Sequence, residues 1–134
     1  MSLQKSFKIE TTVKRIKKRN GKIVKFVPSK IIRAIQGAFK SAGEEGDHQA
    51  EKLAREVISE VEKRFNQKVI PEVEQVQDLI ESVLKKNDYD EVYNAFRLYR
   101  ELHRKLRMIS SLVDSDELID KYLSRADWRV KENA

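Results

Sequence analysis

The sequence predicts an α+β fold that is mostly helical, with a four-helix bundle covering a small three-stranded sheet and a short C-terminal helix. Apolar residues recur every three or four positions along most of the 134-residue chain, which is the helical period. The turn dipeptide Asn20-Gly21 separates two short strand-like runs near the N-terminus. The chain has only four glycines and two prolines, and 40% of its residues are apolar, which is enough for one small core.

The sheet is predicted from an N-terminal hairpin and one later segment. The runs Val13–Ile16 and Lys22–Val27 flank the turn at Arg19-Asn20-Gly21. Asn-Gly favours a type I′ turn, in which both central residues have positive φ. We expect residues 69–71 to add a third strand beside the hairpin, because a lone two-stranded hairpin is marginally stable in water.

Four amphipathic helices are predicted from the apolar periodicity. We expect Gly43 to end the first helix, and Asp47 and Asp88 to cap the second and the fourth. Residues 108–115 are predicted to form a break, followed by a short fifth helix over 116–124. The four main helices are expected at about 29–42, 48–66, 74–86 and 89–107.

The net charge of +6 is unevenly distributed. Residues 11–43 carry ten Lys or Arg and no Asp or Glu, whereas residues 44–91 carry seven basic and fourteen acidic residues. A second basic segment, 97–107, has five Lys or Arg and one Glu, and its arginines recur at helical spacing. Two basic segments around an acidic middle favour a local anion site. The carboxylates of the middle segment are interpreted as the solvated faces of its helices.

Several classes of protein are disfavoured by what the sequence lacks. With no cysteine, the chain has no disulfide or thiolate metal site, and its two histidines are isolated. Nucleotide-binding glycine motifs and hydrolase motifs are absent from the sequence. The chain has no apolar run of membrane-spanning length and no apolar signal segment. We therefore expect a cytoplasmic protein that binds a ligand, with no membrane association and no catalytic residues of its own.

The basic hairpin has two interpretations from its residues alone. It is either a solvated edge that lysine protects from aggregation, or part of a phosphate site beside the start of the first helix. An alternative function is a basic nucleic-acid-binding helical domain that uses the hairpin and the arginine ridge. The acidic middle and the lack of exposed aromatic platforms in the basic stretch argue against nucleic acid.

Three segments in order resemble one known family. Residues 16–31, IKKRNGKIVKFVPSKI, look like the opening signature of the ATP-cone domain, an allosteric nucleotide-binding module at the N-terminus of many ribonucleotide reductases. Residues 69–81 are similar to the family's third strand and following helix, and 94–104 to its last helix. The resemblance covers about residues 13–107. It implies ATP or dATP as an allosteric ligand, accompanied by Mg²⁺, in a site roofed by the hairpin.

The resemblance also assigns nucleotide-binding residues by position. Family members often carry polar residues where this chain has Val24 and Val27, two positions near the base and the helix start. The implied set comprises a phosphate-binding pair in the turn, an apolar residue beside the base, two residues that close the site, and polar groups from later helices: Lys18, Arg19, Phe26, Lys30, Ile31, Gln77, Arg104 and Lys105.

Residues 116–123, DELIDKYL, followed by 127–133, DWRVKEN, resemble the junction into the catalytic subunit of anaerobic (class III) ribonucleoside-triphosphate reductases. We therefore expect an arm over 1–12, the cone over 13–107, and a linker with the start of a truncated catalytic domain over 108–134. The resemblance implies that ATP activates and dATP inhibits overall activity. The implied partners are the catalytic domain of the same reductase, other reductase subunits, and further copies in a nucleotide-dependent homo-oligomer.

Overall fold

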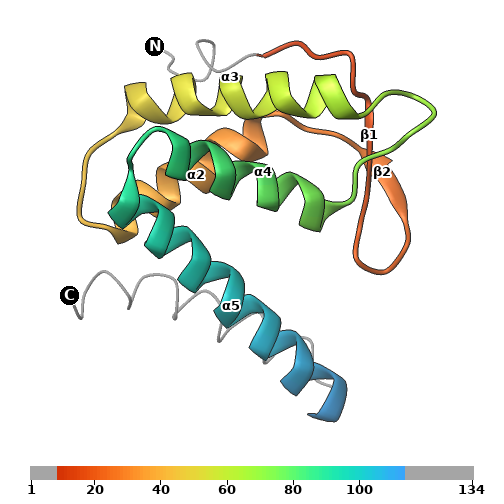
Figure 1. Ribbon diagram of the computed structural model, residues 1–134. Helices are drawn as coiled ribbons and strands as arrows, with labels where there is room; N and C mark the ends of the chain where they lie inside the picture. Colours follow the sequence, from red (N-terminus) through yellow and green to blue (C-terminus); the bar gives the residue numbers. More distant parts are fainter. Residues whose placement is uncertain (1–8, 114–134) are drawn as a thin grey trace, which may run out of the picture.

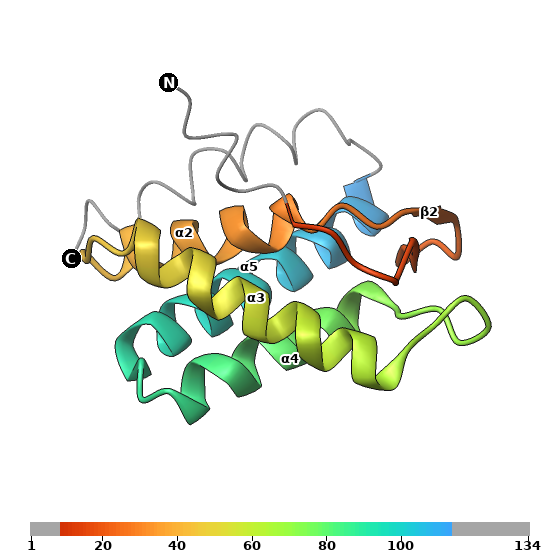
Figure 2. The same cartoon turned by 90° about the horizontal axis from the view of Figure 1, so that it is seen from above.

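The computed structural model describes residues 9–113, which form a small hairpin and four helices (Figure 1). This confirms the mostly helical class with an N-terminal antiparallel sheet. Helix α2 packs against α3 and α5, α3 packs against α4, and α4 packs against α5, so the helices close around one core (Figure 2). Residues 1–8 of the predicted arm and the whole of the predicted fifth helix lie outside the described residues. The elements are β1 Arg15–Lys17, β2 Ile23–Lys25, α2 Ser29–Ser41, α3 Asp47–Arg64, α4 Val73–Lys86 and α5 Asp90–Val113.

The hairpin turn spans the predicted residues 19–21, but its type differs from the predicted one. The Gly21 N–H donates to the Lys18 carbonyl at 2.9 Å, and the Lys18 N–H donates to the Lys22 carbonyl at 2.8 Å. Gly21 has φ of 90°, while Asn20 is not in the positive-φ region. This is a three-residue loop of a type I turn followed by a left-handed glycine, not a type I′ turn. The Asn20 side chain is used differently, since its Oδ1 accepts a hydrogen bond from the Lys22 N–H.

The predicted third strand is reduced to a single bridge. The sheet has two strands, and Lys17 makes one isolated parallel bridge with Glu72. The Lys17 N–H donates to the Pro71 carbonyl at 2.8 Å, but Pro71 has no N–H to extend the ladder. Glu72 then caps α4, forming a capping box with Gln75. The chain therefore enters a helix immediately after the bridge, and this bridge holds the hairpin against the start of α4.

Two helices end with a left-handed residue. Gly43, with φ of 77°, follows α2 as predicted. Asp88, with φ of 65°, occupies the same position after α4, and the next N–H, that of Tyr89, donates to the Leu84 carbonyl at 3.0 Å. Asp88 therefore closes α4, so the prediction that it caps α5 is wrong. The prediction of a cap at Asp47 is also wrong, because this residue is already inside α3.

Helix α5 is longer than predicted. It continues to Val113 without the expected break after Arg107. Residues 108–113 contain no glycine or proline, and the Ser111 hydroxyl donates to the Met108 carbonyl within the helix at 2.7 Å. Serines that resemble a break in the sequence are therefore accommodated by a local hydrogen bond.

Within residues 9–113, no helix combines the length and the apolar character needed to cross a membrane.

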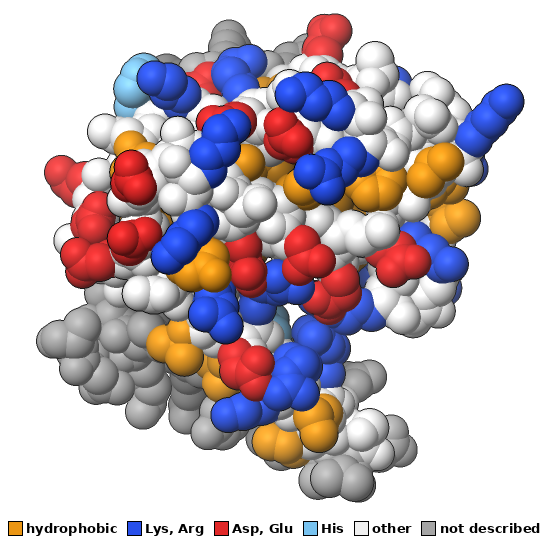
Figure 3. Space-filling model, in the orientation of Figure 1, with side chains coloured by type: hydrophobic (Ala, Val, Ile, Leu, Met, Phe, Trp, Pro, Cys, Tyr) orange, Lys and Arg blue, Asp and Glu red, His pale blue; other side chains and the backbone are white. Residues whose placement is uncertain are grey.

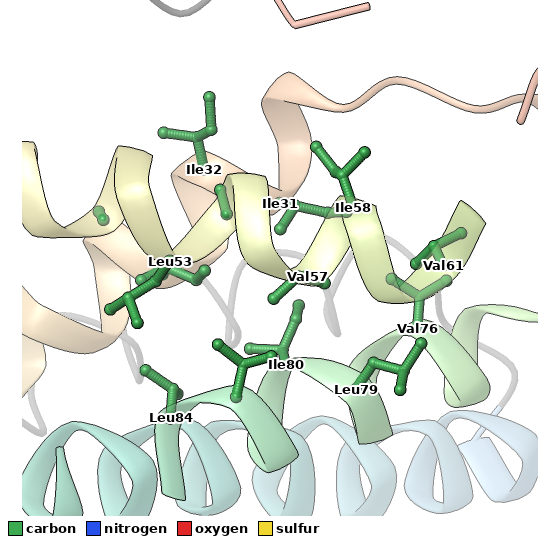
Figure 4. Close-up of a cluster of buried hydrophobic side chains, with 14 of the residues drawn as sticks. Ile31, Ile32, Leu53, Val57, Ile58, Val61, Val76, Leu79, Ile80 and Leu84 are labelled. Carbon is green, nitrogen blue, oxygen red and sulfur yellow. The ribbon is translucent and has the colours of Figure 1, made fainter. Parts of the chain in front are cut away.

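The core lies between the four helices and extends beneath the hairpin. Figure 4 shows side chains of α3 and α4 facing each other, with Val57 and Ile80 near the centre. Val13 and Phe26 enter the same cluster from the hairpin region and anchor it to the bundle. Burial of these apolar side chains is the main favourable contribution to folding. The rest of the cluster is contributed by the helices and Phe65: Ile31, Ile32, Ile35, Ala38, Phe39, Ala50, Leu53, Ala54, Ile58, Val61, Phe65, Val76, Leu79, Val83, Leu84, Val92 and Phe96.

A pair of glycine substitutions tests this packing. A Cβ on Gly46 would lie 2.3–2.8 Å from ring atoms of Phe39, whereas a Cβ on Gly37, inside α2, would meet open space. Gly46→Ala should lower the free energy of unfolding by roughly 1–3 kcal/mol through overpacking. Gly37→Ala should raise it by about 0.5–1 kcal/mol because alanine favours helix. Urea denaturation measures both, and equal effects of the two substitutions would contradict this packing.

Candidate functional site

A pocket of about 500 Å³ opens where the hairpin turn, α4 and α5 meet. Figure 3 shows acidic and basic side chains interleaved on the face of the molecule where α4 and α5 lie. Five arginines and three glutamates line the pocket, an excess of two positive charges. An excess of this sign suits an anionic ligand. The full lining is Arg19, Glu74, Gln77, Glu81, Asn94, Arg97, Leu98, Arg100, Glu101, Arg104 and Arg107.

Arg19 joins the hairpin turn to α4. Its Nε donates to Glu74 Oε2 at 2.7 Å, and its Nη2 donates to Gln77 Oε1 at 3.0 Å. Glu74 and Gln77 are three residues apart, so they lie on the same face of α4. The guanidinium is thereby oriented by two partners more than fifty residues away in the sequence. It lies at the edge of the pocket, where a ligand's anionic group can reach it.

Arg100 joins α5 to α4. Its Nη1 donates to Asp78 at 3.0 Å and to Glu81 at 2.6 Å, and its Nη2 donates to Glu74 at 2.7 Å. Burial lowers the pKa of Arg100, but the hydrogen bonds from these three carboxylates outweigh burial and raise it. Three carboxylates satisfy this arginine, so we assign it to holding the helices together.

Glu74 is shared among three arginines. Besides Arg19 and Arg100, Nη2 of Arg107 lies 3.8 Å from Glu74 Oε2. Burial raises the pKa of Glu74, but the hydrogen bonds from Arg100 and Arg19 outweigh burial and hold the pKa below its ordinary value. Glu74 is therefore ion-paired as well as partly solvated, because α5 packs its arginines against this part of α4.

Arg107 lies in a locally electropositive environment. Burial lowers its pKa most, the charge of Arg19 lowers it further, and Glu74 only partly opposes them. Arg104, one turn earlier on α5, is paired with Glu101 and also lines the pocket. The wall contributed by Arg19, Arg104 and Arg107 therefore presents positive charge that the neighbouring carboxylates do not fully neutralise.

A second pocket, of about 490 Å³, shares Arg19 and Glu74 with the first. It lies between the hairpin turn and the first turn of α4. The N-terminus of a helix presents free N–H groups and the positive end of the helix dipole. Its lining consists of Lys17, Lys18, Arg19, Asn20, Gly21, Glu72, Val73 and Glu74.

The structure brings together some of the predicted site residues. Arg19, Gln77 and Arg104 line the first pocket, and Lys18 lines the adjoining one. Lys30 and Lys105 are exposed and line neither of these two pockets.

Phe26 and Ile31 are each 5% exposed and belong to the core. Their assigned nucleotide contacts, like those of the other implied residues, stay predictions.

Three residues that form the ion pairs of the first pocket were not in the predicted set: Glu74, Arg100 and Arg107. The helical spacing of the α5 arginines was a usable signal for two of them. No sequence pattern marks Glu74 in the same way, because its arginine partners meet it only once the hairpin turn, α4 and α5 are packed together. Among residues 9–113, no group of three or more His, Asp or Glu side chains is placed to hold a metal ion.

Comparison with known proteins identifies the family. Residues 14–105 match the family described as the ATP cone domain, and the chain belongs to this family. It is similar to the vitamin B12-dependent ribonucleoside-diphosphate reductase of Thermoplasma acidophilum, with 35% identity over 100 residues that cover 71% of this chain and 12% of the relative. It is also similar to the ribonucleoside-diphosphate reductase subunit alpha of Treponema pallidum, with 32% identity over 95 residues, 68% of this chain and 11% of the relative.

A third relative is also a ribonucleoside-diphosphate reductase. The ribonucleoside-diphosphate reductase subunit alpha of Chlamydia trachomatis is 29% identical over 102 residues, which cover 67% of this chain and 10% of that protein. The matched region is thus about a tenth of the length of each of these reductases. These relatives do not single out the anaerobic class expected from residues 108–134, so the reductase class stays a prediction.

The lowered pKa of Glu74 predicts a pH-dependent stability. Because the folded-state pKa lies below the ordinary value of 4.5, the ion pairs of Glu74 stabilise the fold fully above that pH and are lost as pH falls through the folded-state pKa. The wild-type protein should have a larger free energy of unfolding than Glu74→Gln near neutral pH, and the difference should shrink below pH 4.5. Urea denaturation across this range measures it, and a difference independent of pH would contradict the ion pairing.

Proposed function

We propose that this chain is an allosteric ATP- and dATP-binding domain that controls the overall activity of a ribonucleotide reductase. Membership of the ATP-cone family supports the ligand class. The observation that carries the proposal is the arginine-lined pocket closed by the hairpin turn, which lies almost entirely inside the matched region. An excess of positive charge in a pocket of this size suits the triphosphate of one nucleotide.

Three arginines are the proposed phosphate ligands. Arg19, Arg104 and Arg107 come from the turn and from successive turns of α5, and each presents a guanidinium fork that matches two phosphate oxygens. Lys18, from the adjoining pocket, would add a point charge. Phosphate oxygens and water would hold the accompanying Mg²⁺, which commonly binds proteins through few protein ligands.

The remaining implied residues are proposed to frame the rest of the nucleotide. Phe26 and Ile31 support the wall beneath the hairpin, close to the proposed base. Lys30 and Lys105 are exposed and line neither pocket, and their proposed role is to contact the ligand from outside the two pockets. Gln77 holds Arg19 in place, so its proposed role is to position the phosphate ligand.

The proposed regulation follows the family pattern. ATP would favour activity and dATP would inhibit it by changing association with the catalytic part, with other reductase subunits or with another copy of the chain. The two nucleotides differ by one ribose hydroxyl, and coupling free energies between allosteric sites are typically about 1–3 kcal/mol. An anaerobic ribonucleoside-triphosphate reductase remains our proposed context, on the resemblance of residues 108–134.

Substitution of Arg19 tests the proposed site. Arg19→Ala removes a charged hydrogen-bond donor from the pocket and should weaken ATP and dATP binding by about tenfold or more, measured by isothermal titration calorimetry. Arg55→Ala is the matched control, because Arg55 also pairs with one glutamate but lies on α3 and lines neither pocket. Absence of nucleotide binding by the wild type, or tight salt-dependent binding of duplex DNA in its place, would overturn the proposed function.

A further inference from the structure

Glu74 is the only residue in the two pockets, other than Arg19, that lines both of them. Its side chain is 46% exposed, so it faces the space that a ligand would enter and is not sealed in the core. Its Oε2 is within 2.7 Å of Arg19 Nε and 3.8 Å of Arg107 Nη2. One carboxylate oxygen therefore lies between two of the arginines that are proposed to bind phosphate.

The other ion pairs show why Glu74 differs from the remaining carboxylates. Arg100 keeps Asp78 and Glu81 as partners whether or not Glu74 contacts it. Among residues 9–113, Arg19 has only the neutral Gln77 as a further side-chain partner, and Glu74 is the carboxylate that pairs with Arg107. Loss of Glu74 therefore leaves Arg100 neutralised but frees the charges of Arg19 and Arg107.

A phosphate group and this carboxylate present the same chemistry to a guanidinium. Both are anionic oxygen acceptors that form short charged hydrogen bonds with the fork. A phosphate cannot bind Arg19 and Arg107 in full while Glu74 holds them, because two anions at one site repel each other.

We propose that Glu74 is an internal counter-ion that occupies the phosphate position of the pocket and is displaced from Arg19 and Arg107 by a bound triphosphate. This inference rests on the proposed function for the identity of the ligand, but its chemistry concerns any polyphosphate. Glu74 thus lowers the affinity for anions and couples ligand binding to the hairpin. When the anion takes Arg19, the ion pair between the turn and Glu74 opens, while the hydrogen bond from Arg19 to Gln77 and the backbone bridge at Lys17 remain.

Displacement of Glu74 by a ligand also changes how the hairpin turn is connected to the helices. Before ligand binding, the turn is held to α4 through Arg19 and Glu74. With a polyphosphate bound, the turn is held to α5 through the ligand and Arg107. The ligand thereby replaces the Arg19–Glu74 ion pair with a link between the hairpin and α5, and that change can be transmitted to whatever the helices contact.

Glu74→Gln tests the displacement directly. The amide keeps the size of the side chain and can still accept a hydrogen bond from Arg19, but it removes the competing charge. Isothermal titration calorimetry with inorganic tripolyphosphate and with ATP should show about tenfold tighter binding than the wild type. A purely structural role predicts the opposite, since loss of the ion pairs would disorder the arginines and weaken binding.

Two control variants separate displacement from a general change of charge. Glu81→Gln removes a pocket-lining carboxylate that pairs with Arg100, and Glu51→Gln removes one on α3 that pairs with Arg55. Tightening should be smaller for Glu81→Gln and about absent for Glu51→Gln. Equal tightening in Glu81→Gln and Glu74→Gln, or no tightening in Glu74→Gln, overturns the counter-ion role.

A further variant tests the same competition without removing an ion pair. Gln77→Glu places a second carboxylate on Arg19, whose Nη2 lies 3.0 Å from Gln77 Oε1, and should weaken tripolyphosphate binding by about tenfold. Unchanged binding overturns the inference. Tripolyphosphate binding that responds to these variants in a protein that binds no nucleotide would support the counter-ion role and refute the proposed function. Absence of any anion binding, in wild type and variants alike, would refute both.

Discussion

The meeting of three arginines at Glu74 is the interaction on which the candidate site depends. Arg19 comes from the hairpin turn, whereas Arg100 and Arg107 come from α5, and Glu74 lies in the first turn of α4. Charged hydrogen bonds at 2.7 Å are strong and directional, so one carboxylate fixes the relative positions of three elements. The two basic segments that are separate in the sequence meet at this contact.

The backbone supports the same arrangement independently of the side chains. The bridge between Lys17 and Glu72 sets the hairpin beside the start of α4, and the capping box of Glu72 and Gln75 begins the helix at that point. Glu74 follows within the first turn, so its side chain faces the hairpin. Beneath it, Phe26 packs into the helical core and gives the hairpin a fixed base. The side-chain network therefore lies on a junction that backbone hydrogen bonds and apolar packing also hold.

The helices and the hairpin could be predicted because they depend on local signals. Apolar periodicity located α2 to α4 within one or two residues, and Asn20-Gly21 located the turn. The turn type could not be predicted from the dipeptide alone, because the pairing of Lys18 with Lys22 makes the loop three residues long. The third strand was overpredicted, since β-propensity does not reveal that Pro71 and the following cap stop the ladder.

The candidate site was harder to predict than the helices, because its contacts join elements that are far apart in the sequence. The arginine spacing along α5 and the basic turn were visible in the sequence, and the resemblance connected them. Glu74 looked like one of many carboxylates on a solvated helix face, because its importance arises from α5 packing across α4 and from the turn reaching over both. Interactions between elements that are more than twenty residues apart leave no periodic signal in a single sequence.

The central claim is that a nucleotide binds between the hairpin turn, α4 and α5 through arginine side chains. A nuclear magnetic resonance titration that follows the Nε–Hε signals of assigned arginines tests it most directly. On addition of ATP, the signals of Arg19, Arg104 and Arg107 should shift together and saturate, while that of Arg55 on α3 should stay in place. Saturable shifts confined to Arg55 and its surroundings, or no shift at Arg19, Arg104 and Arg107, would contradict the account.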